Sequence, residues 1–87
     1  SAPSVRERKA AVVPEGVDGD LLARLKALRK RLADRDGVPA YIVFNDRTLT
    51  EMAQLRPRTP AQLLNVSGVG ASKLARYGED FLDELQR

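Results

Sequence analysis

The part of this chain best suited to binding an anion is the run Gly68-Val69-Gly70-Ala71-Ser72-Lys73. It does not match the phosphate-binding loop of ATPases, which needs four residues between its glycines, nor a dinucleotide-binding loop, which needs a glycine where Lys73 stands. A tight Gly-Val-Gly turn that opens a helix can still bring backbone N–H groups close to a phosphate. Lys73 and Arg76 would then lie on one helix face beyond the turn. Glycines that serve only to form the turn are the alternative.

Tyr41 is the aromatic residue most able to contact a nucleobase, because it follows Pro39 in a segment between helices. An exposed tyrosine ring stacks on bases, whereas core packing with the hydroxyl at the surface is the alternative. Cations near it in the sequence could extend a basic surface: Arg47, and from the first predicted helix Lys26, Arg29 and Lys30.

Charge is distributed unevenly along the chain, whose net charge is +3. Residues 21–35 hold six basic residues and one acid, whereas residues 79–87 hold four acids and one base. We therefore expect a positive region and a negative end, and a positive region attracts polyanions. Solvated helix faces are the alternative explanation of both runs.

Catalytic, metal and cofactor sites are not expected. The sequence has no cysteine and no histidine, which removes thiolate chemistry, the commonest general base and the commonest metal ligand. The carboxylates fall near predicted helix ends or on the outer face of the last helix, where capping, helix dipoles and solvation explain them. No pair of acids converges.

The 87 residues suffice for one small domain, and 43% hydrophobic residues suffice for a compact core. No apolar run approaches the roughly 20 residues that span a bilayer, and the first nine residues lack the apolar core of a secretory signal. We expect a cytoplasmic, monomeric domain of a longer protein. Residues 1–17 are expected to be a linker or flexible tail, and residues 18–87 the helical domain.

The helices that position these residues follow from apolar spacing and capping signals. Leucines at 21, 25, 28 and 32 form one stripe of a helix over 18–36, which Gly37 and Pro39 end. Residues 38–44 suggest a strand, but no other segment could pair with it. We therefore expect an extended or 3₁₀ segment in which Ile42, Val43 and Phe44 are mostly buried.

Two more helices are predicted by capping boxes, and another two by the glycines at positions 70 and 78. Thr48 with Glu51 predicts a capping box for a helix to Leu55, and Thr59 with Gln62 predicts another for residues 60–65. Leu63 and Leu64 should both point inward. A helix then follows Gly70 to Tyr77, Gly78 marks a break or kink, and a last helix carries Phe81, Leu82 and Leu85. The sequence thus predicts an all-α bundle of five helices.

Four motifs in order carry a resemblance to a known family. They are the leucine-rich run from Leu21 to Arg29, the run Val38-Pro39-Ala40-Tyr41-Ile42-Val43-Phe44-Asn45-Asp46, the run Thr48-Leu49-Thr50-Glu51-Met52-Ala53, and the Gly-Val-Gly turn continuing to Lys73. Together they cover about residues 20–86 and resemble the HRDC ("helicase and RNase D C-terminal") domain. The chain is most similar to the version in bacterial RecQ-type DNA helicases, and ribonuclease D fits less closely.

The resemblance implies a five-helix bundle that acts as an auxiliary nucleic-acid-binding module of a RecQ-type helicase. Such a module binds single-stranded or branched (junction) DNA and helps substrate targeting in repair or recombination, which implies a nucleoid association, while ATP hydrolysis belongs to other parts of the helicase. The tyrosine matching Tyr41 and its basic neighbours are implicated in strand binding. The full set of candidate contacts is Tyr41, Arg47, Gly68, Gly70, Lys73, Arg76, Lys26, Arg29 and Lys30.

Two other functions remain open. The acidic last helix, with Glu79, Asp83 and Glu84, would suit a protein-interaction module that docks on the helicase core or on a repair protein. An RNA-processing accessory domain, as in the ribonuclease members of the family, is the third. No cofactor is expected for any of them.

Overall fold

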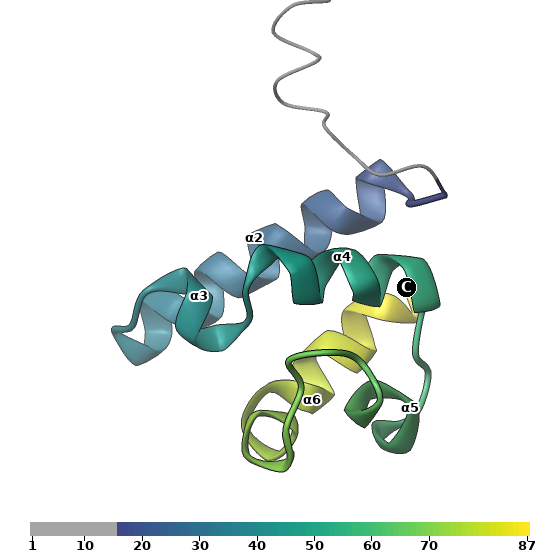
Figure 1. The fold of residues 1–87 in the computed structure, drawn as a ribbon. Coiled ribbons are helices and arrows are strands. Elements are labelled where there is room, and N and C mark those ends of the chain that lie inside the picture. The colour runs from purple at the N-terminus through teal and green to yellow at the C-terminus, as the bar shows by residue number, and fades with distance from the viewer. Residues whose placement is uncertain (1–15) are drawn as a thin grey trace, which may run out of the picture.

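A computed structural model describes residues 16–87 as a bundle of helices (Figure 1). The helices are α2 (Gly19–Asp36), α3 (Ala40–Val43), α4 (Asp46–Leu55), α5 (Pro60–Leu64) and α6 (Ala71–Leu85). The described part of the chain contains no strand, and none of its helices is long and apolar enough to cross a membrane. The expected all-α, five-helix architecture is confirmed. Nearly all of the tail expected over residues 1–17 lies outside the described residues.

Helix α2 forms as the local signals predict. The Asp18 carboxylate accepts hydrogen bonds from the N–H groups of Asp20 and Leu21, at 2.9 and 3.2 Å, and so caps the helix. Gly37 ends it in the left-handed conformation, at φ 67°. The leucine stripe faces the core, and its four members are each at most 6% exposed. Signals within and beside α2 therefore account for where this helix begins, where it ends and which face it buries.

The segment after Pro39 differs in detail from the extended or 3₁₀ segment expected. It is a single turn of helix, α3, in which the Ile42 N–H donates to the Pro39 carbonyl and the Phe44 N–H donates to the Ala40 carbonyl. Val43 and Phe44 are buried as expected, but Ile42 is 41% exposed. One helical turn points neighbouring side chains in different directions, so burying Val43 leaves Ile42 at the surface.

Helix α4 begins three residues earlier than predicted, because its cap is Asn45 and not Thr48; the Asn45 side chain accepts from the Thr48 N–H at 2.8 Å. The predicted Thr48–Glu51 capping box is therefore wrong. The Thr48 hydroxyl instead donates to the Ser67 carbonyl at 2.8 Å, and the Glu51 carboxylate accepts from the Ser67 N–H at 3.0 Å. Both side chains thus hold the turn that precedes α6 against α4.

Helix α6 is continuous, and the predicted break at Gly78 is wrong. A Cβ at Gly78 would lie 2.7 Å from Cδ1 of Leu74 on the same helix and 3.7 Å, an ordinary contact distance, from Cδ2 of Leu63 on α5. The buried Gly78 therefore lies where α5 packs on α6. Thr59 caps α5 as predicted, with a 3.1 Å hydrogen bond from the Gln62 N–H, but the Gln62 side chain accepts from the Arg58 N–H and does not complete the capping box. Leu63 is buried, but Leu64 is 44% exposed, contrary to expectation.

The core is centred on Phe44, whose ring meets the rings of Tyr77 and Phe81 edge-on at centroid distances of 6.2 and 5.1 Å. Helices α2 and α6 flank it and run antiparallel. Polar contacts join the start of α2 to the end of α6, through Arg24 and Glu84, and the end of α2 to the first half of α6, through Asp36 and Tyr77. These two ends of the α2–α6 pair carry the surfaces described below.

Candidate nucleic-acid interface

A hollow of about 260 Å³ lies where α3 and the end of α2 meet the first turns of α6. It brings together two of the predicted contact residues, Lys73 and Arg76, with the neighbour of a third, Ile42. Its full lining is Asp36, Val38, Ile42, Ser72, Lys73, Arg76 and Tyr77. The hollow is therefore partly cationic and partly apolar, which suits a ligand that has both a charged and a flat apolar part.

Asp36 organises the hollow. It accepts hydrogen bonds from Arg35 Nε at 2.9 Å, from the Tyr77 hydroxyl at 2.7 Å and from Arg76 Nε at 3.4 Å. The Arg35 hydrogen bond first, and the Tyr77 bond next, hold the pKa of the Asp36 carboxyl well below its usual range. The same hydrogen bond raises the pKa of Tyr77. Asp36 is thus ionised, and it orients the Arg76 side chain.

Lys73 and Arg76 lie against aromatic rings at the mouth of this hollow. Lys73 Nζ is 6.0 Å from the centroid of the Phe44 ring, and the Arg76 guanidinium carbon is 6.0 Å from that of Tyr77. The Arg76 side chain is 67% exposed and meets Asp36 through a long contact, so its remaining N–H groups face solvent. Two cations are therefore held about one helical turn apart on the surface of α6.

Tyr41 is 66% exposed, so its ring lies at the surface and not in the core. Its neighbour Ile42 lines the hollow, and the two side chains are among the large hydrophobic residues exposed in the described part of the chain. The one-turn helix α3 causes this exposure, because Val43 and Phe44 take the inward positions. Tyr41 is thus an accessible aromatic ring, one residue along the chain from Ile42 of the hollow.

The two glycines of the turn differ in their surroundings. Gly68 has φ +89°, and a Cβ there would overlap the hydroxyl oxygen of Thr48, so packing and backbone conformation both require glycine. Gly70 is the N-cap of α6 with φ −99°, and a Cβ there would meet nothing within 4 Å. No side chain caps α6. The space in front of this helix terminus is therefore open at Gly70.

The remaining predicted cations are not equivalent. Arg29 is only 14% exposed, and its NH1 nitrogen contacts the Phe44 carbonyl at 3.0 Å and the Asp46 carboxylate at 2.8 Å. The Arg29 hydrogen bond lowers the pKa of Asp46. Lys30 is exposed and paired with Asp34 on its own helix. Lys26 and Arg47 are exposed, and neither forms an ion pair with another residue of the 16–87 range.

Sequence analysis did not anticipate the contacts of two acids. Asp36 ends the first helix directly before Gly37, in line with its place near a predicted helix end, but it is also the hydrogen-bonding centre of the hollow. Glu84 was placed on a solvated outer face, yet it is 8% exposed and accepts from Arg24 Nε at 3.0 Å. Each partner lies more than 40 residues away along the chain, so no local spacing signals either contact.

Comparisons with known proteins agree on one family. A family model described as "HRDC domain" matches residues 18–85. The ATP-dependent DNA helicase RecQ of Pasteurella multocida is 53% identical over 70 residues, which are 80% of this chain and 11% of that protein. RecQ of Bacillus subtilis is 44% identical over 78 residues, covering 90% of this chain and 13% of that protein.

A second group of helicases and a solved structure also match. The ATP-dependent DNA helicase UvrD2 of Mycobacterium tuberculosis is 40% identical over 82 residues, or 94% of this chain and 12% of that protein. The chain spans only about a tenth of the length of these curated relatives. The solved structure "D. radiodurans RecQ HRDC domain 3" superposes with a TM-score of 0.75 at 39% identity, covering 77% of this chain and 88% of that one.

Proposed function

The chain belongs to the HRDC domain family, and on that premise we propose that it is a non-catalytic DNA-binding module of a RecQ-type helicase. It would hold single-stranded or branched DNA for the catalytic part of the parent protein during repair or recombination. The observation that carries this proposal is the 66% exposure of Tyr41, whose neighbour in the chain, Ile42, lines the hollow that holds Lys73 and Arg76.

The strand would bind through stacking and phosphate contacts together. A base stacked on Tyr41 contributes about 1–3 kcal/mol, whatever the base. Lys73, Arg76 and the open N-terminus of α6 at Gly70 would contact the adjoining phosphate. The phosphate must compete with Asp36 for Arg76, but that pair is long and its arginine well exposed, so the exchange is nearly neutral.

The other candidate cations would contribute unequally to the same surface. Lys26 and Arg47 are exposed and would add long-range attraction to the strand. To contact the strand, Lys30 must break its ion pair with Asp34, which contributes little stability because both side chains are exposed. Arg29 already bonds the Phe44 carbonyl and Asp46, so we propose a mainly structural contribution from it, which positions α3 and α4.

An NMR titration of this chain with a short oligo-dT strand tests the proposal. We expect shifts around Tyr41, Lys73 and Arg76 that weaken sharply between low and 200 mM salt, with a Kd on the order of 10⁻⁴–10⁻⁶ M. Tyr41→Ala should weaken binding about 5- to 150-fold through lost stacking, without unfolding the domain. Tyr41→Phe should retain it, and Leu55→Ala, at an exposed position of α4, should change neither property.

Two results would contradict the proposal. No shifts at millimolar DNA would exclude strand binding by this domain, and equal binding by Tyr41→Ala would remove the stacking role. Competition between oligo-dT and oligo-rU distinguishes a DNA module from an RNA-processing accessory, because tighter rU binding favours the latter.

A second candidate function, docking on the helicase core of the parent protein, is favoured by a separate groove. A groove of about 400 Å³ between α5 and α6 has Leu74 and Leu82 among its apolar lining, with Glu79 and Asp83 as its acids. A basic surface with an apolar centre would fit it. Glu79→Lys with Asp83→Lys should then abolish association with the helicase core while oligo-dT binding persists. Retained association would exclude this groove.

A further inference from the structure

A second hollow, of about 210 Å³, lies at the opposite end of the α2–α6 pair, where α2 begins and α6 ends. Four of its six lining residues are arginines: Arg24, Arg56, Arg58 and Arg87, with Leu85 and Gln86. It shares no residue with the Lys73–Arg76 hollow. Residues 24 and 36 mark the two ends on α2, which places the hollows roughly 18 Å apart along the axis at about 1.5 Å per residue.

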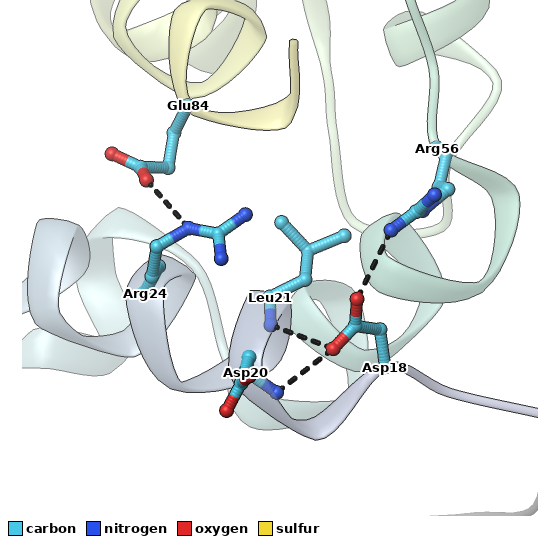
Figure 2. Close-up of polar contacts among 6 residues, drawn as sticks. All are labelled: Asp18, Asp20, Leu21, Arg24, Arg56 and Glu84. Carbon is cyan, nitrogen blue, oxygen red and sulfur yellow. Dashed lines mark hydrogen bonds and ion pairs between the residues drawn. The ribbon is translucent and has the colours of Figure 1, made fainter. Parts of the chain in front are cut away.

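Arg24 and Arg56 are each anchored by one carboxylate, and each still has other N–H donors (Figure 2). Arg24 donates through Nε to the buried Glu84 at 3.0 Å, and Arg56 donates through NH2 to Asp18 at 3.2 Å. Figure 2 shows the two terminal nitrogens of Arg24 on the far side of the guanidinium from Glu84. A guanidinium has five N–H donors, so each anchored arginine keeps donors for a ligand.

The backbone at Arg56 is a second, independent observation. Arg56 ends α4 with φ 50° and is the only non-glycine residue of the described range with positive φ. Glycine takes this left-handed position without strain, whereas other residues lose about 1 kcal/mol or more there. The chain nevertheless has an arginine at this position, and the next residue, Pro57, is buried. The strained backbone therefore belongs to Arg56, whose guanidinium donates to Asp18 beside the hollow.

The charges at this end do not balance. Asp18 and Glu84 each bond one of the four arginines. Arg58 and Arg87 form no ion pair with any other residue between 16 and 87. Among residues 16–87, two of the four guanidinium groups around this small polar hollow therefore have no carboxylate side chain as an ion-pair partner. Planar guanidinium donors fit the oxygens of a phosphate, and the lining offers no aromatic ring on which a base could stack.

We propose that this arginine hollow is a second phosphate-binding site, which takes a backbone phosphate of nucleic acid. The anion site follows from the arginines alone, whereas the nucleic-acid source of the phosphate rests on the proposed function. A strand running straight along α6 from the first hollow would pass the carboxylates of Glu79 and Asp83, which repel it. The second phosphate therefore comes from another arm or segment of the nucleic acid.

NMR titration of the whole chain with dT4, and with a three-way DNA junction, tests this site. The arginine Nε–H signals of Arg24 and Arg56 report on it, and those of Arg76 report on the first hollow. Arg58→Glu should abolish the dT4-induced shifts of Arg24 and Arg56, leave those of Arg76, and weaken junction binding at least about fivefold. Arg31→Glu, the same charge reversal at an exposed α2 position lining neither hollow, should weaken it less than about twofold.

Three outcomes would overturn the proposal. The first is unchanged shifts of Arg24 and Arg56 in Arg58→Glu, and the second is an equal effect of Arg31→Glu on junction binding. The third is a response of these signals to an oligoglutamate peptide but not to dT4, which would assign the hollow to an acidic protein. Shifts at Arg24 and Arg56 without any at Arg76 would instead refute strand binding at Tyr41, Lys73 and Arg76, and would support phosphate binding in the arginine hollow.

Discussion

Replacing Gly68 by alanine should destabilise the domain far more than the same substitution at Gly37 or Gly70. At Gly68 the backbone has φ +89°, and the added Cβ would overlap the Thr48 hydroxyl oxygen. That hydroxyl is buried and donates to the Ser67 carbonyl at 2.8 Å. Backbone strain of about 1–2 kcal/mol and loss of a buried hydrogen bond, about 1–3 kcal/mol, together predict a loss of about 2–5 kcal/mol.

The other two glycines isolate each contribution. Gly37 also has positive φ, +67°, but a Cβ there meets nothing within 4 Å, so only the strain of about 1–2 kcal/mol remains. Gly70 has neither positive φ nor a close neighbour, so only the poorer N-cap preference of alanine remains, and we expect a loss of at most about 1 kcal/mol. Because Gly70→Ala leaves the fold intact, it also tests whether close approach of a phosphate needs glycine at this N-cap.

Thermal and urea unfolding, followed by the helical circular dichroism signal, measures these differences. A loss of 1 kcal/mol lowers the Tm of a domain this size by about 4–8 °C, so Gly68→Ala should lower it by about 10 °C or more. A double-mutant cycle with Thr48→Ala supplies the decisive control, because removing the hydroxyl should reduce the effect of Gly68→Ala to the backbone strain alone. An equal effect in both backgrounds would refute the proposed contact.

Two further predictions concern buried charge. Arg29→Ala should lower the free energy of unfolding by about 1–2 kcal/mol, because it leaves the Phe44 carbonyl and Asp46 without their donor. Lys26→Ala should change it by less than about 0.5 kcal/mol. Equal effects of the two substitutions in urea unfolding would contradict the structural contribution assigned to Arg29. The domain should lose stability as the pH falls from 6 toward 2, because the pKa of Asp36 is lower in the folded than in the unfolded state, and its contribution disappears as the carboxyl becomes protonated. In urea unfolding at pH 6 and pH 2, the free energy of unfolding of Asp36→Asn should depend less on pH than that of the unmodified domain. An unaltered pH dependence would show that Asp36 does not cause the loss of stability.

Local signals in the sequence are enough to predict the first helix. The leucine stripe, the Asp18 cap and the Gly37 stop lie within or beside the helix that they define, and α2 begins and ends within a residue of the predicted bounds. Short segments lack this redundancy. A run of apolar residues as short as 38–44 fits a strand, a 3₁₀ segment or one helical turn equally, so the exposure of Ile42 was not predictable.

Where local rules failed, a partner distant in sequence decided the outcome. Asn45 and Thr48 are both good N-caps; Asn45 caps α4, while Thr48 bonds Ser67. Gly78 is unfavourable in a helix by propensity, but it lies inside α6, where it is buried and in ordinary contact with Leu63 of α5. In the candidate site, motif order identified Tyr41 as a contact residue, and the contact itself stays a prediction. The Asp36–Tyr77 bond, 41 residues apart, had no local signal.

The antiparallel pairing of α2 with α6 also has a consequence for how the chain folds. The contacts that close the pair are the most distant in sequence, 41 residues between Asp36 and Tyr77 and 60 between Arg24 and Glu84. Loop closure over such distances is slow compared with packing between neighbouring elements, so α2, α3 and α4 should associate before α6 docks. During synthesis on a ribosome, the leucine face of α2 then stays incompletely covered until α6 has emerged. A nascent chain paused within α6 would be the species most exposed to chaperones and to aggregation.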